Sequence, residues 1–104
     1  IPILIGGSGF KRTLPAVARH ADIWHTYISL EKFHDASARL DDLAAAAGRA
    51  GTDIERSVGW EDADSANAFR DAGATTFTTE IHPTDEGYDF SVLTEMLAWR
   101  DAQQ

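Results

Sequence analysis

The chain has no cysteine among its 104 residues, so it forms no disulfide and no thiolate metal site. It also has no apolar run near the ~20 residues that a membrane-spanning helix needs. Basic residues are scarce: 9 Lys and Arg stand against 17 Asp and Glu, for a net charge of −8 at pH 7. This charge argues against nucleic acid or an anionic membrane surface as a partner. We expect one small cytoplasmic domain over residues 1–104.

A glycine-rich turn is the most informative stretch of the chain. It follows the apolar run 3–5 and consists of Gly6, Gly7, Ser8 and Gly9. Lys11, Arg12 and Thr13 come next and lead into a segment with helical periodicity. A strand, a glycine turn and a helix start direct several backbone N–H groups at one anion. The sequence therefore predicts a phosphate-binding turn; the alternative is an ordinary strand-to-helix turn that needs glycine for tight packing.

The charges are unevenly distributed along the chain. Lys11, Arg12 and Arg19 against Asp22 give residues 1–30 a net charge of +2, so the remaining residues carry −10. The single locally basic region thus surrounds the glycine turn. This distribution favours the anion-binding interpretation.

Four β-rich segments alternate with four segments of helical periodicity. The expected strands are 3–5, 22–28, 53–60 and 74–81. The expected helices run from about Lys11 to His20, between Ser29 and Gly48, between Asp62 or Asp64 and Gly73, and after a cap at Asp89. Pro15 fits only a first turn, which places the start of the first helix near Arg12 with Thr13 or a neighbour as its cap. Residues 82–87 are expected to form a loop.

This alternation predicts an α/β fold of four βα units with parallel strands and right-handed crossovers. Two architectures fit it. One is a compact four-stranded open sheet. The other is half of a (β/α)8 TIM barrel, which in full takes about 250 residues.

Several motifs resemble the luciferase-like monooxygenase family. Residues 2–9 read Pro-Ile-Leu-Ile-Gly-Gly-Ser-Gly, residues 12–14 read Arg-Thr-Leu, and residues 18–24 read Ala-Arg-His-Ala-Asp-Ile-Trp. Looser similarity continues through residues 48–57 and 72–77. The family consists of flavin- or deazaflavin-dependent oxidoreductases with a (β/α)8 barrel. The resemblance implies that this chain corresponds to the C-terminal half of such a barrel.

The resemblance also implies a cofactor, either FMN or the deazaflavin coenzyme F-420, whose phosphate binds the glycine turn. It assigns this role to Gly6, Gly7, Ser8, Gly9, Arg12 and Thr13. The sequence departs from the family at Phe10, where glutamate is frequent, and at His25, where asparagine is frequent. The implied function is that of part of a luciferase-like oxidoreductase. The alternative is a half barrel that binds a phosphorylated ligand without catalysis, or one that is purely structural and dimerises.

The carboxyl ends of parallel strands share one edge, where (β/α)8 enzymes place their active sites. His25 and His82 fall at such ends and are candidate acid/base groups; the alternative is that both are rim residues without a chemical role. No spacing matches a zinc or iron signature, so no metal site is expected. Half a barrel also leaves two open sheet edges and an apolar face. We therefore expect either a homodimer or a complementary N-terminal half barrel, and an inactive chain in isolation.

Overall fold

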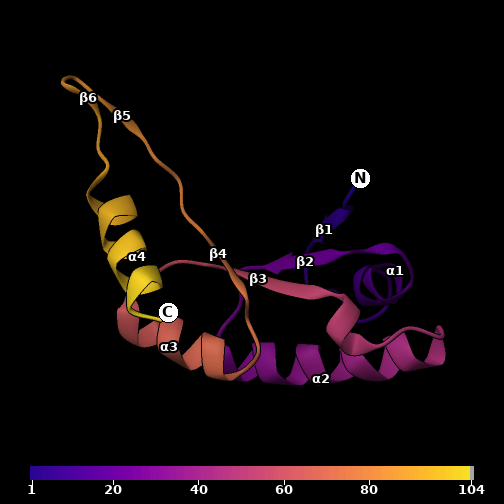
Figure 1. Ribbon diagram of the computed structural model, residues 1–104. Helices are drawn as coiled ribbons and strands as arrows, with labels where there is room; N and C mark the ends of the chain where they lie inside the picture. The colour runs from indigo at the N-terminus through magenta and orange to yellow at the C-terminus, as the bar shows by residue number, and fades with distance from the viewer. Residues whose placement is uncertain (104) are drawn as a thin grey trace.

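The computed structural model describes residues 1–103 and contains one four-stranded sheet with helices along it (Figure 1). The strands of this sheet are β1 (Leu4–Gly6), β2 (Ile23–Thr26), β3 (Glu55–Gly59) and β4 (Thr76–Thr78). The helices are α1 (Thr13–His20), α2 (Leu30–Ala46), α3 (Ala63–Asp71) and α4 (Ser91–Ala102), with a 3-10 turn, η1, at Gly51–Asp53. A separate hairpin consists of β5 (Pro83–Thr84) and β6 (Gly87–Tyr88). No helix in this part of the chain is both long and apolar enough to cross a membrane.

The strands lie in the order β1-β2-β3-β4 and all pairs are parallel. In this register Gly6, His25, Ser57 and Thr76 form one row across the sheet. Sequential order means that every crossover moves in the same direction, as in a (β/α)8 barrel. The predicted α/β fold with four βα units is confirmed. Within residues 1–103 the sheet stays open, because β1 and β4 each pair on one side only.

The hydrophobic core lies between the sheet and the helices, which gather along one side of it (Figure 1). Strand side chains alternate between faces, so in β2 Trp24 and Thr26 are buried while Ile23 and His25 are half-buried. The Trp24 ring stacks on Phe33 of α2 at a centroid distance of 5.8 Å. Trp24 therefore points to the helices, and His25 points to the opposite face of the sheet.

Two arginines hold the loop between α2 and β3 in place. The guanidinium of Arg56, which is 7% exposed, donates to the carbonyl oxygens of Gly51 and Ile54 and pairs with Asp41 at 2.6 Å. Arg49 donates to three carbonyl oxygens at the end of α1, the shortest contact being 2.7 Å. The carbonyl of Val17 also accepts the backbone N–H of Ala21 at 3.0 Å, and Arg49 adds a cap to the end of α1 from a distant part of the chain.

Most predicted helix boundaries are confirmed. Ser29 and Asp62 cap α2 and α3, each accepting a bond from the backbone N–H three residues on. Gly48 and Gly73 follow these helices with φ of +79° and +108°. Thr13 or a neighbour was expected as the cap of α1, and the N-cap position is that of its neighbour Arg12, with Thr13 the first residue of the helix.

The predictions for the last quarter of the chain need correction. The strand expected over 74–81 covers only Thr76–Thr78, because beyond this point the chain leaves β3 and no other strand pairs with it. The loop expected at 82–87 contains the β5–β6 hairpin. Asp89 is not the N-cap of α4; Phe90 is, although the Asp89 carboxylate accepts a 2.9 Å bond from the Ser91 N–H.

The hairpin extends away from the sheet, in the upper left of Figure 1, and lengthens the molecule. The principal extents are 50 × 26 × 26 Å and the radius of gyration is 15.1 Å. A compact domain of this length has a radius of gyration of about 13 Å. The excess matches a sheet and hairpin that are exposed on sides where a complete domain would bury them.

Candidate functional site

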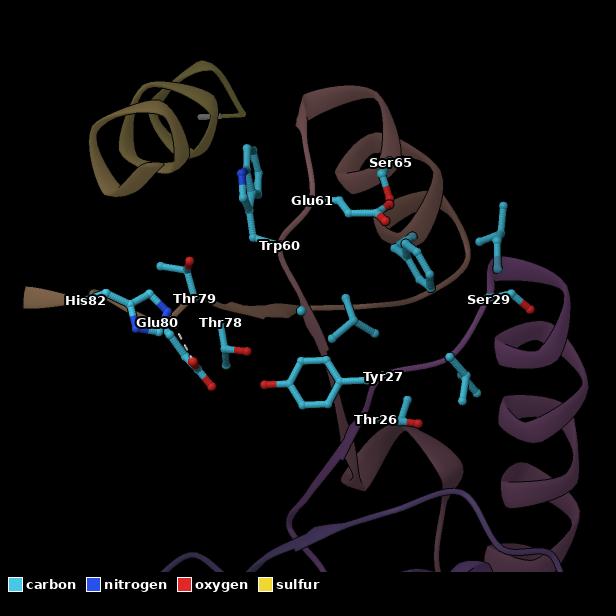
Figure 2. Close-up of a pocket in the computed structure, with 15 residues that line it drawn as sticks. Thr26, Tyr27, Ser29, Trp60, Glu61, Ser65, Thr78, Thr79, Glu80 and His82 are labelled. Atoms are coloured by element: carbon cyan, nitrogen blue, oxygen red, sulfur yellow. Dashed lines mark ion pairs between the residues drawn. The ribbon is translucent and has the colours of Figure 1, made fainter. Parts of the chain in front are cut away.

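A cavity of about 820 Å³ lies at the carboxyl ends of β2, β3 and β4 (Figure 2). This is the edge of a parallel sheet at which ligands bind. Its volume falls within the range of small-molecule sites. Three aromatic residues contribute to its wall: Tyr27 after β2, Trp60 after β3 and Phe69 of α3. The sheet edge predicted to carry the site therefore contains a cavity large enough for a cofactor ring.

Polar groups in this cavity are of two kinds. Glu80 and His82 form an ion pair, with 3.4 Å between Oε2 and Nε2, and both side chains are about three-quarters exposed. In contrast, the indole nitrogen of Trp60 and the hydroxyl oxygen of Thr78 are buried and have no hydrogen-bond partner within residues 1–103. Buried polar atoms without partners are uncommon in folded proteins.

The glycine turn follows β1 at the same edge of the sheet. Gly7 has φ of +122°, a backbone conformation that favours glycine, and its N–H donates to the carbonyl oxygen of His25 at 3.0 Å. A Cβ atom on Gly7 would lie 3.1 Å from Cγ2 of Thr13, and one on Gly9 would lie 3.3 Å from its Oγ1. The turn thus folds back over Thr13, in a space that larger residues would fill.

The N-terminus of α1 behind this turn is unoccupied by acidic or capping side chains. Its N-cap, Arg12, makes no side-chain capping bond, and the first turn of the helix holds no acidic residue. Within residues 1–103 neither Lys11 nor Arg12 forms an ion pair. Helix N-termini attract anions through their N–H groups and the helix dipole, although here the Leu14 N–H already donates to the carbonyl oxygen of Gly9 at 2.9 Å and Pro15 has no N–H. Lys11 and Arg12 add two positive charges at this end.

Trp24 connects the glycine turn to the core. Its ring is fully buried, and its indole N–H donates to the carbonyl oxygen of Gly7 at 2.6 Å. The structure places it in the core, where it also holds the turn. No sequence pattern indicated this bond, since it joins residues 17 positions apart in two different units.

His25 lies between the turn and the cavity but does not line the cavity. Its Nδ1 is 2.7 Å from the hydroxyl oxygen of Ser57, and its ring meets Tyr27 edge-on at 4.5 Å. Partial burial lowers the pKa of His25 below its usual 6.5, because the charged imidazolium loses solvation. The structure brings His82, Glu80 and Tyr27 to one cavity and leaves His25 beside it. The two candidate acid/base groups therefore do not share a cavity.

No three His, Asp or Glu side chains in residues 1–103 come together as a possible metal site. The six residues assigned to phosphate binding, in contrast, lie together in the turn and at the start of α1. Thr13 is in contact range of the turn, and Arg12 is exposed beside it.

Comparison with known proteins gives likenesses to solved structures but no match to a protein family. No protein-family model matches the chain, and no curated protein matches it. Among solved structures, the chain is similar to DmoA from Hyphomicrobium sulfonivorans, with 20% sequence identity and a TM-score of 0.49. The match covers 70% of this chain and 17% of DmoA, so the chain spans a small part of that protein. At this level the likeness carries no argument about function.

Proposed function

We propose that the chain contributes the cofactor phosphate site of a luciferase-like, flavin- or deazaflavin-dependent oxidoreductase. The phosphate would bind at Gly6, Gly7, Ser8 and Gly9, with Arg12 and Thr13 beside it. One observation carries the proposal: β1 ends in a turn with a positive-φ glycine that leads into a helix N-terminus with no side-chain cap and no acidic residue in its first turn. The proposal rests on this chain's own residues.

Glycine and Trp24 fix the shape of the turn. Side chains at positions 7 and 9 would run into Thr13, so the turn packs closely on Thr13 only because both residues are glycine. Trp24 holds the carbonyl oxygen of Gly7 from the core side, which fixes the turn before a ligand arrives. A turn ordered in advance binds its ligand with a smaller entropic loss.

The turn fits a phosphate in charge. The chain carries −8 overall, yet Lys11 and Arg12 lie beside the turn without acidic partners in residues 1–103. A guanidinium binds a phosphate through paired hydrogen bonds. The strong local contrast in charge favours an anionic ligand at this place on the surface.

A flavin or deazaflavin supplies hydride or electron transfer through its ring when bound. The chain's own contribution is to bind and orient it. The turn reaches the cavity through a series of contacts, from Gly7 to the carbonyl of His25 and from the His25 ring to Tyr27 in the cavity wall. Tyr27 and Trp60 offer aromatic surfaces for a planar ring. FMN and coenzyme F-420 both present a phosphate, so both remain candidates.

A second candidate function is phosphate-ligand binding without catalysis. It is favoured by the placement of the two histidines. His82 is exposed and paired with Glu80, and His25 lies outside the cavity. The chain by itself thus brings no pair of acid/base histidines to the cavity where a cofactor ring would bind.

The test is a fluorescence titration of the purified chain with FMN and with coenzyme F-420, using inorganic phosphate as a competitor. Saturable binding that phosphate displaces is the expected result. Arg12→Ala should weaken it roughly 10- to 150-fold, since a hydrogen bond to a charged group contributes about 1.5–3 kcal/mol. Arg39→Ala, an exposed arginine on α2, is the matched control and should bind as the unaltered chain does.

Two results would reject the phosphate site. One is the absence of binding up to millimolar cofactor, and the other is equal affinity of the Arg12→Ala and Arg39→Ala variants. Turnover with the reduced cofactor then separates the two functions. Binding without turnover supports the second candidate.

A further inference from the structure

The last helix, α4, differs from the other three in how it packs. Helices α1, α2 and α3 each bury residues, whereas α4 has none that is fully buried. In right-handed βαβ units a helix covers the groove between the strand before it and the strand after it. No strand lies beyond β4 in residues 1–103, so α4 covers a groove with only one wall.

The two edges of the sheet that lack a neighbouring strand both present apolar side chains. A hollow of about 650 Å³ separates α4 from β4 and is lined by Phe77, Leu93, Met96 and Leu97 among others. At the opposite edge of the sheet, Ile3 and Leu4 are 48% and 57% exposed. Apolar side chains exposed at both free edges of one sheet indicate that another strand belongs at each edge.

The two edges carry opposite charge. Residues 1–21, which form β1 and α1, hold a net charge of +3. Residues 74–104, which include β4, the hairpin and α4, hold a net charge of −5. The edge that lacks a following strand is therefore complementary to the edge that lacks a preceding one. Such complementarity directs association and selects its orientation.

We propose that a second copy of this chain fills the gap, with β4 of each copy paired with β1 of the other. A two-fold axis through the centre of the assembly keeps all eight strands parallel. The order then becomes that of a closed (β/α)8 barrel, in which α4 covers β4 and the β1 of the second copy. The exposed Leu4 points to the barrel interior, and both free edges disappear.

The pairing also completes the site, a step that rests on the proposed function. Closing the barrel brings the glycine turn of one copy next to the end of β4 of the other, where Thr78, Glu80 and His82 line the cavity. A cofactor whose phosphate binds one copy would then contact the cavity wall of both. Each of the two sites is composite, and neither is complete in a single chain.

Disulfide formation between introduced cysteines tests this arrangement. The chain has no cysteine of its own, so no native thiol competes in the reaction. Leu4→Cys places a thiol on β1, and Thr76→Cys and Thr78→Cys place one at two positions on β4 to cover the register. Within one copy β1 and β4 are three strand spacings apart, about 14 Å. A disulfide needs Cα atoms within about 7 Å, so only two copies can form it.

Under mild oxidation, mixing Leu4→Cys with a β4 variant should give a disulfide-linked dimer, whereas each variant alone should remain unlinked. The unaltered chain should sediment at twice its 11.3 kDa mass, and salt should weaken the dimer. A chain that stays at 11.3 kDa and gives no mixed disulfide overturns the proposal and assigns the edges to another polypeptide. Equal linkage in each variant alone also overturns it.

The two proposals fail separately. A mixed disulfide with no displaceable FMN or F-420 binding would leave the dimer standing and remove the phosphate site. Cofactor binding by a strictly monomeric chain would do the reverse.

Discussion

Replacing Trp24 with phenylalanine tests the link between the core and the glycine turn. Trp24 is fully buried, stacks on Phe33, and donates its indole N–H to the carbonyl of Gly7. Phenylalanine keeps an aromatic ring in the core but removes the five-membered ring and its donor. The change therefore acts on packing and on the turn together.

The magnitude follows from these two losses. The missing atoms correspond to roughly two or three buried CH2 groups, or about 2 kcal/mol. The lost hydrogen bond adds about 1 kcal/mol. Unfolding entropy of about 2.1 cal/mol/K per residue gives about 0.2 kcal/mol/K for 104 residues. A loss of about 3 kcal/mol should therefore lower the melting temperature by roughly 12–15 °C.

Thermal unfolding followed by circular dichroism measures the stability change, and amide hydrogen exchange at Gly7 reports on the turn. Trp24→Phe should speed exchange at Gly7 beyond what the global loss of stability explains. Trp99→Phe is the matched control. Its indole N–H donates to Asn67 at 2.8 Å, its ring packs on Trp60 and Phe77, and none of these contacts involves the turn.

Two outcomes would refute the reasoning about Trp24. If the melting temperature falls by less than about 4 °C, which corresponds to under 1 kcal/mol, the ring is not packed as described. If Gly7 exchanges equally fast in the Trp24→Phe and Trp99→Phe variants, the indole bond does not order the turn.

Arg49→Lys should destabilise the chain by about 1–2 kcal/mol in urea unfolding, because the two terminal nitrogens of the guanidinium donate to separate carbonyl oxygens at the end of α1 and a single ammonium nitrogen lacks this spread; an unchanged midpoint would contradict this cap. Burial lowers the pKa of His25 in the folded chain, so the unfolded chain binds a proton more readily. Stability from His25 is then present above pH 6.5 and is lost as the pH falls through its lowered pKa. His25→Asn should therefore weaken the pH dependence of the unfolding free energy between about pH 5 and 7. A pH profile identical to that of the unaltered chain would exclude this contribution of His25.

Local patterns determined much of the fold. Ser29 and Asp62 were identified as caps because a side-chain oxygen at a helix start satisfies a free N–H within the same turn. Gly48 and Gly73 were identified as stops because the positive φ needed there is a local property. Each of these interactions spans only a few residues, so the sequence contains all of its parts.

The prediction for residues 74–81 was wrong in extent for the opposite reason. The threonines and Phe77 favour extended backbone, but a strand persists only where a neighbour supplies hydrogen bonds. β3 supplies them to Thr76–Thr78, the last being the bond from the Trp60 N–H to the carbonyl oxygen of Thr78, and no strand pairs with the residues beyond. Where a strand ends depends on how far its partner strand continues beside it, and no local pattern in the sequence shows this.

The candidate site shows the same division. The sequence by itself determined the glycine turn, the basic residues beside it and the alternation of strands and helices, because each depends on neighbours along the chain. Only the tertiary structure decided that Trp24 holds Gly7, that His82 lines the cavity while His25 stays beside it, and that α4 has no strand to cover. These facts join segments far apart in sequence, and packing of the whole sheet against its helices fixes them.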